Sequence, residues 1–367
     1  MKFICSTKEL SDALNIVCKA ISGKANIPIL EGIKISACGD EVTLMATDLE
    51  LYIRTKIKAD VKLEGETVVT GRMFADFMRK VSDDEVAVEK YSSTLSVNYG
   101  ANVSEFQCMD DDAYPEPREL SGENGFTAKD KDLKEVIDGV IFCASQDDTR
   151  AILRGCKLAI EDDSLVAVAL DGFRLAVTRC HVFGVTGTLD VVIPAKNLQE
   201  IVKVIGEDDR DVRVTADKNQ VLFDLGNTLI TTRLLEGEFY QYQKIVPQSS
   251  PNTAIIVDKA ALTTSLDRAA LVAKNKKNYV KLSISGDSID IDSASEQGKI
   301  HERVTCSSVE GKDLPIAFNT RFLFDAFGRI KEDLIKMTFY SSTAPSLILP
   351  VDGDRYLYLV LPVRLIG

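Results

Sequence analysis

Residues 128–145 read AKDKDLKEVIDGVIFCAS, and their apolar side chains recur at helical spacing. Positions i, i+3 and i+4 fall on one stripe, which is typical of an amphipathic helix that packs on a core. The stripe consists of Leu133, Val136, Ile137, Val140, Ile141 and Ala144. The same pattern occurs in TKELSDALNIVCKAIS (7–22) and in DKAALTTSLDRAALVAKNKKN (258–278). Leu10, Leu133 and Leu262 hold matching places, 123 and 129 residues apart, which predicts one structural unit repeated three times.

A second helical segment follows in each third of the chain. The three segments are GRMFADFMRKVS (71–82), PAKNLQEIVKVI (194–205) and NTRFLFDAFGRIK (319–331). Phe74, Leu198 and Leu323 match one another, at spacings of 124 and 125 residues. An extended apolar run precedes each segment, namely TVVTG, DVVIP and LPIAF, so each second helix is predicted to follow a buried strand.

Strand-like alternation of apolar and polar residues fills the rest of each third. The corresponding segments are VTLMATDLELYIRT (42–55), LVAVALDGFRLAVTR (165–179) and SIDIDSASEQGKIHERVT (288–305). Two stretches rich in turn residues, PEPRELSGENG (115–125) and PQSSPN (247–252), separate the thirds. We therefore predict an α+β fold of three domains, each with two helices and several antiparallel strands. The predicted domains are residues 1–121, 122–250 and 251–367.

The composition excludes several classes of protein. The 367 residues include only two histidines, His181 and His301, so the commonest general base and metal ligand is scarce. The eight cysteines form no CxxC pair, and no phosphate-binding loop or nucleophile-elbow motif is present. We therefore expect no enzyme, metal or cofactor. The longest apolar runs are too short for a membrane-spanning helix and the N-terminus quickly turns polar, so a cytoplasmic location is expected.

Charge is distributed unevenly along the chain. The formal net charge is −12, yet the six helical segments hold 18 basic against 11 acidic residues, which is +7 and leaves −19 elsewhere. Basic helices are often only solvated faces. The same pattern also fits a helical surface that faces a polyanion on an otherwise acidic protein. Few aromatic residues accompany the basic ones, so contact with a duplex backbone is favoured over stacking on single-stranded bases.

Three motifs carry a family resemblance: NIPILEGIKI (26–35), ALDGFRLAV (169–177) and the ending LPVRLIG (361–367). Together with the threefold repeat, they make the chain similar to bacterial DNA polymerase III beta subunits, the sliding clamps. The resemblance implies DNA-clamp domains, with each chain forming half of a ring made by a head-to-tail homodimer. The helices would line the hole, and the ring would encircle duplex DNA without reading its sequence and slide on it.

The resemblance also implies the function of a DNA polymerase processivity factor. Its partners would be the DNA polymerase III alpha subunit, the clamp loader and repair polymerases, each held by a short hydrophobic peptide motif in a shared pocket. Two other functions stay open from the residues alone. One is an acidic repeat scaffold that presents peptide grooves, and the other is a hydrolase that depends on carboxylates.

Individual site residues follow from the resemblance. The DNA-facing positions are Lys24, Arg72, Gln146, Arg150 and Lys196. The subunit contact comprises Phe106, Cys108, Arg268, Leu271 and Val272. The peptide pocket comprises Leu153, Leu170, Gly172, Phe173, Arg174, Leu175, Tyr240, Lys244, Ile245, Ser346, Leu361, Pro362, Val363, Arg364 and Leu365.

The chain departs from the family pattern in three places. Phe173 stands where the family often has His, Ala151 and Ile152 replace a tyrosine pair found in some members, and Ile366 and Gly367 extend the usual ending.

Two further pairs of residues allow alternative interpretations. Asp48 and Asp171 hold equivalent places 123 residues apart, so each is predicted to stabilise a turn rather than to form a catalytic carboxylate pair. Phe106 and Cys108 alternate on one strand and therefore share a face. That face belongs either to the core or to the subunit contact.

Overall fold

The computed structural model describes residues 1–21, 27–110, 114–118, 120, 124–147, 149–273 and 279–364. All six predicted helices are present. They are α1 (Thr7–Val17), α2 (Gly71–Met78), α3 (Asp130–Ile141), α4 (Ala195–Val202), α5 (Lys259–Ala273) and α6 (Thr320–Phe327). No helix among the described residues is long and apolar enough to cross a membrane.

The threefold repeat is confirmed in the cores. Leu10, Leu133 and Leu262, which match on the first helix of each repeat, are each 0% exposed. Phe74, Leu198 and Leu323, which match on the second helix, are also 0% exposed. Equivalent positions therefore anchor equivalent helices, as the spacing predicted.

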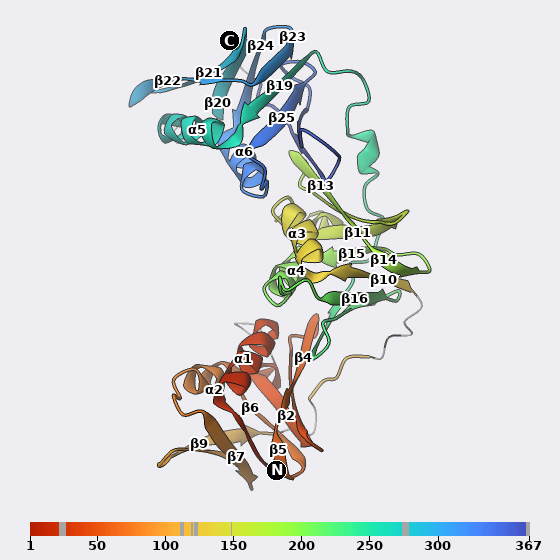
Figure 1. Cartoon of the computed structure of the whole chain (residues 1–367), viewed down its shortest axis with the longest axis vertical. Helices are drawn as coiled ribbons and strands as arrows, with labels where there is room; N and C mark the ends of the chain where they lie inside the picture. The colour runs from red at the N-terminus through yellow and green to blue at the C-terminus, as the bar shows by residue number, and fades with distance from the viewer. Residues whose placement is uncertain are drawn as a thin grey trace. The chain divides into compact units, whose positions relative to one another are not determined.

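In the first repeat, α1 packs against α2 and over two strands, β3 (Glu41–Thr47) and β4 (Leu51–Lys58) (Figure 1). The side chain of Ser6 caps α1 by accepting a hydrogen bond from the backbone N–H of Glu9 at 3.4 Å. Gly71 opens α2 where space is short, because an added Cβ would lie 2.3 Å from Cδ1 of Ile21. The helix pair thus depends on a small residue at the start of α2.

The chain divides into two compact units, and each is organised around antiparallel sheets. The first unit comprises Met1–Lys131, Val182–Leu189 and Lys196–Leu234 and holds one 14-stranded sheet. Its strand order is β14 (Phe183–Thr186), β10 (Asn124–Lys129), β16 (Asp211–Ala216), β17 (Gln220–Asp224), β18 (Thr228–Arg233), β4, β3, β2 (Gly32–Cys38), β6 (Gly65–Thr70), β9 (Asn102–Met109), β8 (Thr94–Tyr99), β7 (Glu85–Tyr91), β1 (Lys2–Ser6) and β5 (Asp60–Leu63).

The second unit comprises Asp132–His181, Asp190–Ala195 and Leu235–Gly367 and holds two sheets. The nine-stranded sheet runs β15 (Asp190–Pro194), β11 (Gly155–Glu161), β12 (Ser164–Leu170), β13 (Arg174–His181), β27 (Tyr356–Val360), β26 (Ser346–Leu349), β25 (Leu334–Phe339), β19 (Thr253–Asp258) and β23 (Ser308–Gly311). The four-stranded sheet runs β22 (Gly298–Thr305), β21 (Ser288–Ser295), β20 (Tyr279–Ser285) and β24 (Leu314–Asn319). Helix α5 packs on β21 and β22 beside α6 (Figure 1).

Two ladders join repeats that were predicted to be separate domains. Strand β18 pairs with β4, and the hydroxyls of Thr55 and Thr228 lie 2.8 Å apart in this joint. Strand β13 pairs with β27, with Leu175 opposite Leu359. Because both ladders cross the predicted boundaries, main-chain hydrogen bonds link each repeat to the next, and the chain forms two compact units.

The turn prediction for the two matching aspartates is confirmed. Oδ1 of Asp48 accepts hydrogen bonds from the N–H groups of Glu50 at 3.1 Å and Leu51 at 2.9 Å. Oδ1 of Asp171 accepts hydrogen bonds from the N–H groups of Phe173 at 2.9 Å and Arg174 at 3.0 Å. Each carboxylate therefore holds the connection between two strands in a tight conformation.

Candidate functional site

A basic side chain stands at the second residue of the second helix in all three repeats. Arg72 opens α2, Lys196 opens α4 and Arg321 opens α6. The side chains of Lys196 and Arg321 are 76% and 72% exposed, and Arg72 is exposed as well. Arg321 was not among the predicted DNA-facing residues. The repeat itself holds the signal, since Arg321 precedes Leu323 by two residues as Arg72 precedes Phe74.

None of these three cations makes a close ion pair within the described chain. A guanidinium N–H of Arg72 donates to the carbonyl of Ile21 at 2.8 Å. Nζ of Lys196 lies 3.7 Å from a carboxylate oxygen of Asp48, and Nε of Arg321 lies 3.8 Å from one of Asp325. Exposed pairs of this kind contribute at most about 1 kcal/mol, so the charges stay available to an external anion.

The other predicted DNA-facing residues lie in loops. Gln146 and Arg150 are exposed in the segment between α3 and the short helix Ala151–Arg154. Lys24 lies outside the described residues.

The predicted peptide pocket is built on one apolar cluster in the second unit. Its buried members are Leu153, Val166, Val168, Leu170, Leu175, Val177, Val192, Phe239, Tyr242, Leu347 and Leu359. Three of them, Leu153, Leu170 and Leu175, were predicted. Tyr242, Leu347 and Leu359 were not, and the nearly continuous burial of β26 and β27 gives no alternation that would single out the last two.

The C-terminal tail runs beside this cluster. The N–H of Leu361 donates to the carbonyl of Phe173 at 2.9 Å, and the N–H of Val363 donates to the carbonyl of Ala317 at 2.8 Å. Leu361 packs on the cluster, and Pro362 is half-buried between these two bonds. The tail is thus fixed to both β13 and β24 up to Val363. Arg364 is exposed, and Leu365 lies outside the described residues.

The turn before β13 carries the most exposed aromatic group of the predicted pocket. Phe173 is 61% exposed, and its ring stacks on Phe322 of α6 with centroids 6.2 Å apart and an interplanar angle of 24°. Gly172 has φ +92°, a conformation that glycine adopts without strain. The turn therefore presents an apolar ring to solvent beside the tail.

Arg174 is placed differently from its neighbours, because it is only 9% exposed. Its guanidinium donates to Asp171 at 2.9 Å, to Asp325 at 2.5 Å and to the carbonyl of Phe142 at 2.9 Å. It also lies over the rings of Phe142 and Phe322, at 5.3 and 4.7 Å from their centroids. Burial opposes its charge, but the hydrogen bonds to Asp325 and Asp171 outweigh burial and raise its pKa. Arg174 thus ties β13 to α3 and α6.

The remaining predicted pocket residues differ in burial. Tyr240 and Ile245 are 46% and 40% exposed, and Lys244 is exposed at the end of the short helix Tyr242–Lys244. Ser346 is 1% exposed, and its hydroxyl has no hydrogen-bond partner in the described part of the chain. Apolar groups with a few polar ones at the edge are the composition that a peptide anchor needs.

Of the predicted subunit-contact residues on β9, Phe106 packs inward. It is 9% exposed, and its ring meets Phe74 and Phe77 edge-on at 5.2 and 4.9 Å. Its neighbour on the same face, Cys108, is partly buried and pairs with Val69 on β6. The core interpretation of this face is therefore favoured in the single chain.

The predicted contact residues on α5 lie at its surface. Leu271 is 60% exposed and Val272 is partly exposed, whereas Leu262 and Leu266 on the opposite stripe are 0% exposed. Arg268 is held by both carboxylate oxygens of Glu302 on β22, at 2.8 and 2.5 Å.

Comparison with known proteins accounts for this architecture. Models of the three domains of the DNA polymerase III beta subunit match the chain: the N-terminal domain over residues 1–117, the central domain over 127–241 and the C-terminal domain over 243–364. The beta sliding clamp of Staphylococcus epidermidis is 32% identical over 379 aligned positions, which cover 99% of both chains. The chain belongs to the DNA polymerase III beta subunit family. The beta sliding clamp of Halalkalibacterium halodurans is likewise 32% identical and covers 99% of this chain and 100% of the relative.

A solved structure agrees with this membership. The crystal structure of the DNA polymerase sliding clamp from Bacillus subtilis is 30% identical, covers 100% of both chains and superposes with a TM-score of 0.95. As a beta subunit, the chain is a processivity factor for DNA polymerase and not an enzyme. The α+β clamp fold predicted from the repeat is confirmed, and the hydrolase interpretation is wrong.

Proposed function

We propose that two copies of this chain close head-to-tail into a ring that encircles duplex DNA, with domains 1–121, 122–250 and 251–367 forming each half. The observation that supports it best is the basic residue repeated at the start of three equivalent helices, Arg72, Lys196 and Arg321. Identical placement gives each repeat one exposed cation at the start of its second helix. Such repeated cations suit sliding, because phosphate contacts hold the duplex without reading its bases.

The subunit contact is proposed between two strand edges. Strand β22 is the last strand of its sheet, and residues 102–107 of β9 pair only with β8, so both leave main-chain groups unpaired within the described chain. Pairing β9 of one copy with β22 of the other satisfies both edges. Such a heterologous contact closes at two copies if the rotation permits, and Leu271 and Val272 on α5 flank it.

The peptide pocket is proposed along β13 and the tail, with Phe173 and Leu361 at its centre. A partner peptide that buries two or three Leu or Phe side chains gains roughly 1.5–3 kcal/mol from each. After ordering costs, the affinity is expected in roughly the micromolar range per site, so partners can exchange. The proposed partners are the DNA polymerase III alpha subunit, the clamp loader and repair polymerases, in the cytoplasm where the chromosome is replicated.

The DNA proposal is tested with the triple variant R72E/K196E/R321E. Loaded wild-type protein should stay on a closed circular plasmid and leave a linearised one. The triple variant should load poorly, and the slope of its salt dependence should fall by about 0.9 for each lost phosphate contact. The matched control is K58E/K218E/K312E, which makes the same change in charge at exposed strand ends and turns. The proposal is contradicted if the wild-type protein is retained equally on circular and linearised plasmid, or if both triple variants lose the same amount of loading.

The pocket proposal is tested by deleting residues 361–367. Binding of a fluorescent alpha-subunit peptide should be lost, while dimerisation by sedimentation and retention on circular DNA persist. Leu63→Ala is the control, since this side chain is 60% exposed on a strand outside the cluster. Unchanged peptide affinity after the deletion would mean that the pocket has been misplaced.

A further inference from the structure

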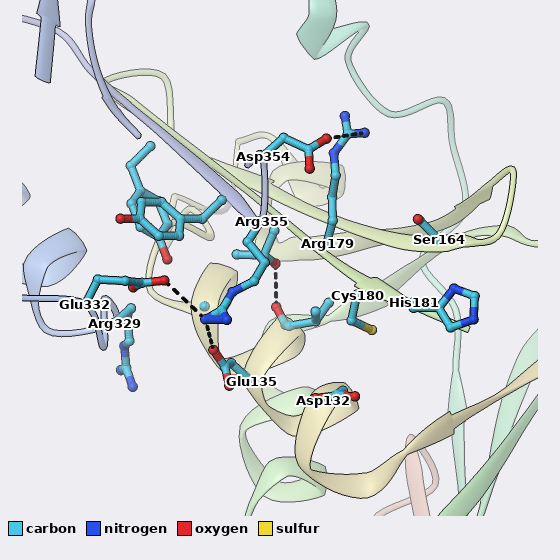
Figure 2. Close-up of a pocket in the computed structure, with 15 residues that line it drawn as sticks. Asp132, Glu135, Ser164, Arg179, Cys180, His181, Arg329, Glu332, Asp354 and Arg355 are labelled. Atoms are coloured by element: carbon cyan, nitrogen blue, oxygen red, sulfur yellow. Dashed lines mark hydrogen bonds and ion pairs between the residues drawn. The ribbon is translucent and has the colours of Figure 1, made fainter. Parts of the chain in front are cut away.

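A second cavity lies at the far end of β13 from Arg174. It has a volume of about 320 Å³, and its walls come from α3, β13, β27 and the segment after α6 (Figure 2). The lining residues Thr178–His181 lie four to seven residues along β13 from Arg174, which is roughly 13–23 Å at about 3.3 Å per residue. None of the predicted pocket residues lines it.

One face of α3 forms the first wall. Asp132, Glu135, Val136 and Gly139 are spaced i, i+3, i+4 and i+7, so they line up along the helix. Gly139 lets the helix approach β13, because an added Cβ would lie 2.7 Å from Cγ2 of Thr178.

The arginines of the cavity are already paired. Arg355 lies between Glu135 at 3.1 Å and Glu332 at 3.3 Å, as Figure 2 shows. Arg179 lies 3.7 Å from Asp354 on the opposite rim (Figure 2). The third arginine of the lining, Arg329, is paired outside the cavity with Asp138 at 2.5 Å.

Unpaired acceptors remain on the acidic side. Oε2 of Glu332 is buried and has no hydrogen-bond partner among the described residues. Asp132, on the exposed mouth of the cavity, makes no ion pair with any part of the chain that the structure describes. Glu135 is paired a second time, with Nζ of Lys331 at 2.6 Å, so the cavity's negative charge without a cation partner in the described chain is that of Asp132.

Tyr356 supplies a second, independent feature. It is only 6% exposed, and its hydroxyl has no hydrogen-bond partner in the described chain. Its ring stacks on Tyr358 with centroids 5.3 Å apart at 19°, and the hydroxyl of Tyr358 lies beside Gly139. The two rings therefore point together toward α3 and into the cavity. Burial, and then the nearby carboxylate of Glu332, raises the pKa of Tyr356. A buried hydroxyl that stays unpaired is costly, so a ligand that pairs it gains affinity.

We propose that this cavity binds an organic cation, a guanidinium or primary ammonium group on a short aliphatic stem. Its N–H groups would donate to Oε2 of Glu332 and to the hydroxyl of Tyr356, with Asp132 adding charge at the mouth. The paired tyrosine rings provide an aromatic wall for such a cation. The volume lies at the small end of ligand cavities, which span roughly 300–1,000 Å³. An anion is disfavoured because each arginine of the lining already has a carboxylate partner.

Agmatine tests the proposal, because it carries both a guanidinium and an amine. Calorimetric titration of the full-length protein should show binding at one site per chain, and neither N-butylurea, a neutral analogue, nor inorganic phosphate should bind. Glu332→Gln should weaken agmatine binding about tenfold and Tyr356→Phe about threefold. Asp352→Asn is the matched control, since this exposed acid precedes the same strand but does not line the cavity.

A capped peptide with a central arginine distinguishes the sources of the cation. Tighter binding of the peptide than of agmatine assigns the site to a basic segment of a partner protein, and the reverse assigns it to a free metabolite. Asp132→Asn separates weaker binding from misfolding. Its side chain is exposed, so the variant should bind agmatine more weakly while its melting temperature stays unchanged. Binding of phosphate in place of agmatine, or equal agmatine affinity in Glu332→Gln and Asp352→Asn, overturns the proposal.

Discussion

At the first residue of β13, Arg174 is 9% exposed, and its guanidinium donates to Asp171, to Asp325 and to the carbonyl of Phe142. At the other end of the strand, the side chain of Arg355 is 57% exposed and sits between two carboxylates, while polar atoms close to it have no partner. Both arginines link the second repeat to the third. Only the first is buried.

The difference separates a buried arginine that crosslinks the fold from an exposed one that lines the proposed cation cavity. The three acceptors of the buried guanidinium all belong to the chain itself, so it fixes the turn that presents Phe173. A loosely held arginine beside an unpaired hydroxyl leaves interactions to be completed. Stability should therefore depend strongly on the Arg174 end and weakly on the Arg355 end.

The largest effect is expected for Arg174→Ala. The change leaves the carboxylate of Asp171 without its cation and leaves Asp325 with only Arg321, 3.8 Å away; losing one partner of a buried pair costs about 3 kcal/mol. Denaturant unfolding should show this loss, and Arg174→Lys should recover part of it, since a lysine keeps the charge but not the forked geometry. A loss below about 0.5 kcal/mol, the scale of a surface change, would contradict the comparison.

A smaller loss is expected for Gly139→Ala at the cavity wall. The new methyl group would collide with Cγ2 of Thr178, and overpacking of this kind costs roughly 1–3 kcal/mol, partly offset by the better helix propensity of alanine. Thr178→Ser removes that methyl while keeping the hydroxyl that donates to the carbonyl of Val136 at 2.7 Å. The serine should therefore destabilise the wild type but stabilise the alanine variant in a double-mutant cycle. If the effects of Gly139→Ala and Thr178→Ser simply add, the proposed collision between the two side chains does not occur.

Arg355→Ala should cost at most about 1 kcal/mol, because exposed ion pairs contribute little. Its effect should shrink further in high salt, which screens exposed charges. Thermal melts at low and high ionic strength measure the loss of stability and its dependence on salt. A loss as large as that of Arg174→Ala would erase the distinction between the two ends of β13.

The smallest effect, and one of opposite sign, is expected for Tyr356→Phe. Removing a buried hydroxyl that has no partner should stabilise the protein by at most about 0.5 kcal/mol, since no hydrogen bond is lost. Tyr114→Phe is the control, because its hydroxyl shares one proton between the carbonyls of Gly32 at 3.0 Å and Met45 at 3.2 Å. Removing this hydroxyl should destabilise the protein. Destabilisation by Tyr356→Phe would reveal a partner for the hydroxyl.

The helices and the repeat could be predicted from sequence because they depend on local periodicity. Leu10, Leu133 and Leu262 identified three cores at once, since a buried stripe recurs every three or four residues on a helix. Asp48 and Asp171 identified turns for the same reason, as each acts on residues two and three positions ahead.

The linkage of the repeats and the second cavity could not be predicted, because both depend on contacts between distant segments. The pairing of β13 with β27 joins residues about 180 positions apart, and nothing in either strand specifies its partner. The cavity brings together Glu135, Glu332 and Tyr356 from three elements that only tertiary packing makes neighbours. Arg174 was predicted as a pocket residue from the resemblance, which stays a prediction; its three acceptors add that it also crosslinks the fold.

The two joint ladders have a consequence for dissecting the molecule. The middle repeat lends β18 to β4 on one side and β13 to β27 on the other, so a fragment cut at 122 and 250 would expose two bare strand edges. Bare edges template pairing with other chains. Such a fragment should be insoluble when expressed by itself, because it also lacks Leu347 and Leu359 from its apolar cluster. In the whole chain the neighbouring repeats cover these edges and prevent aggregation.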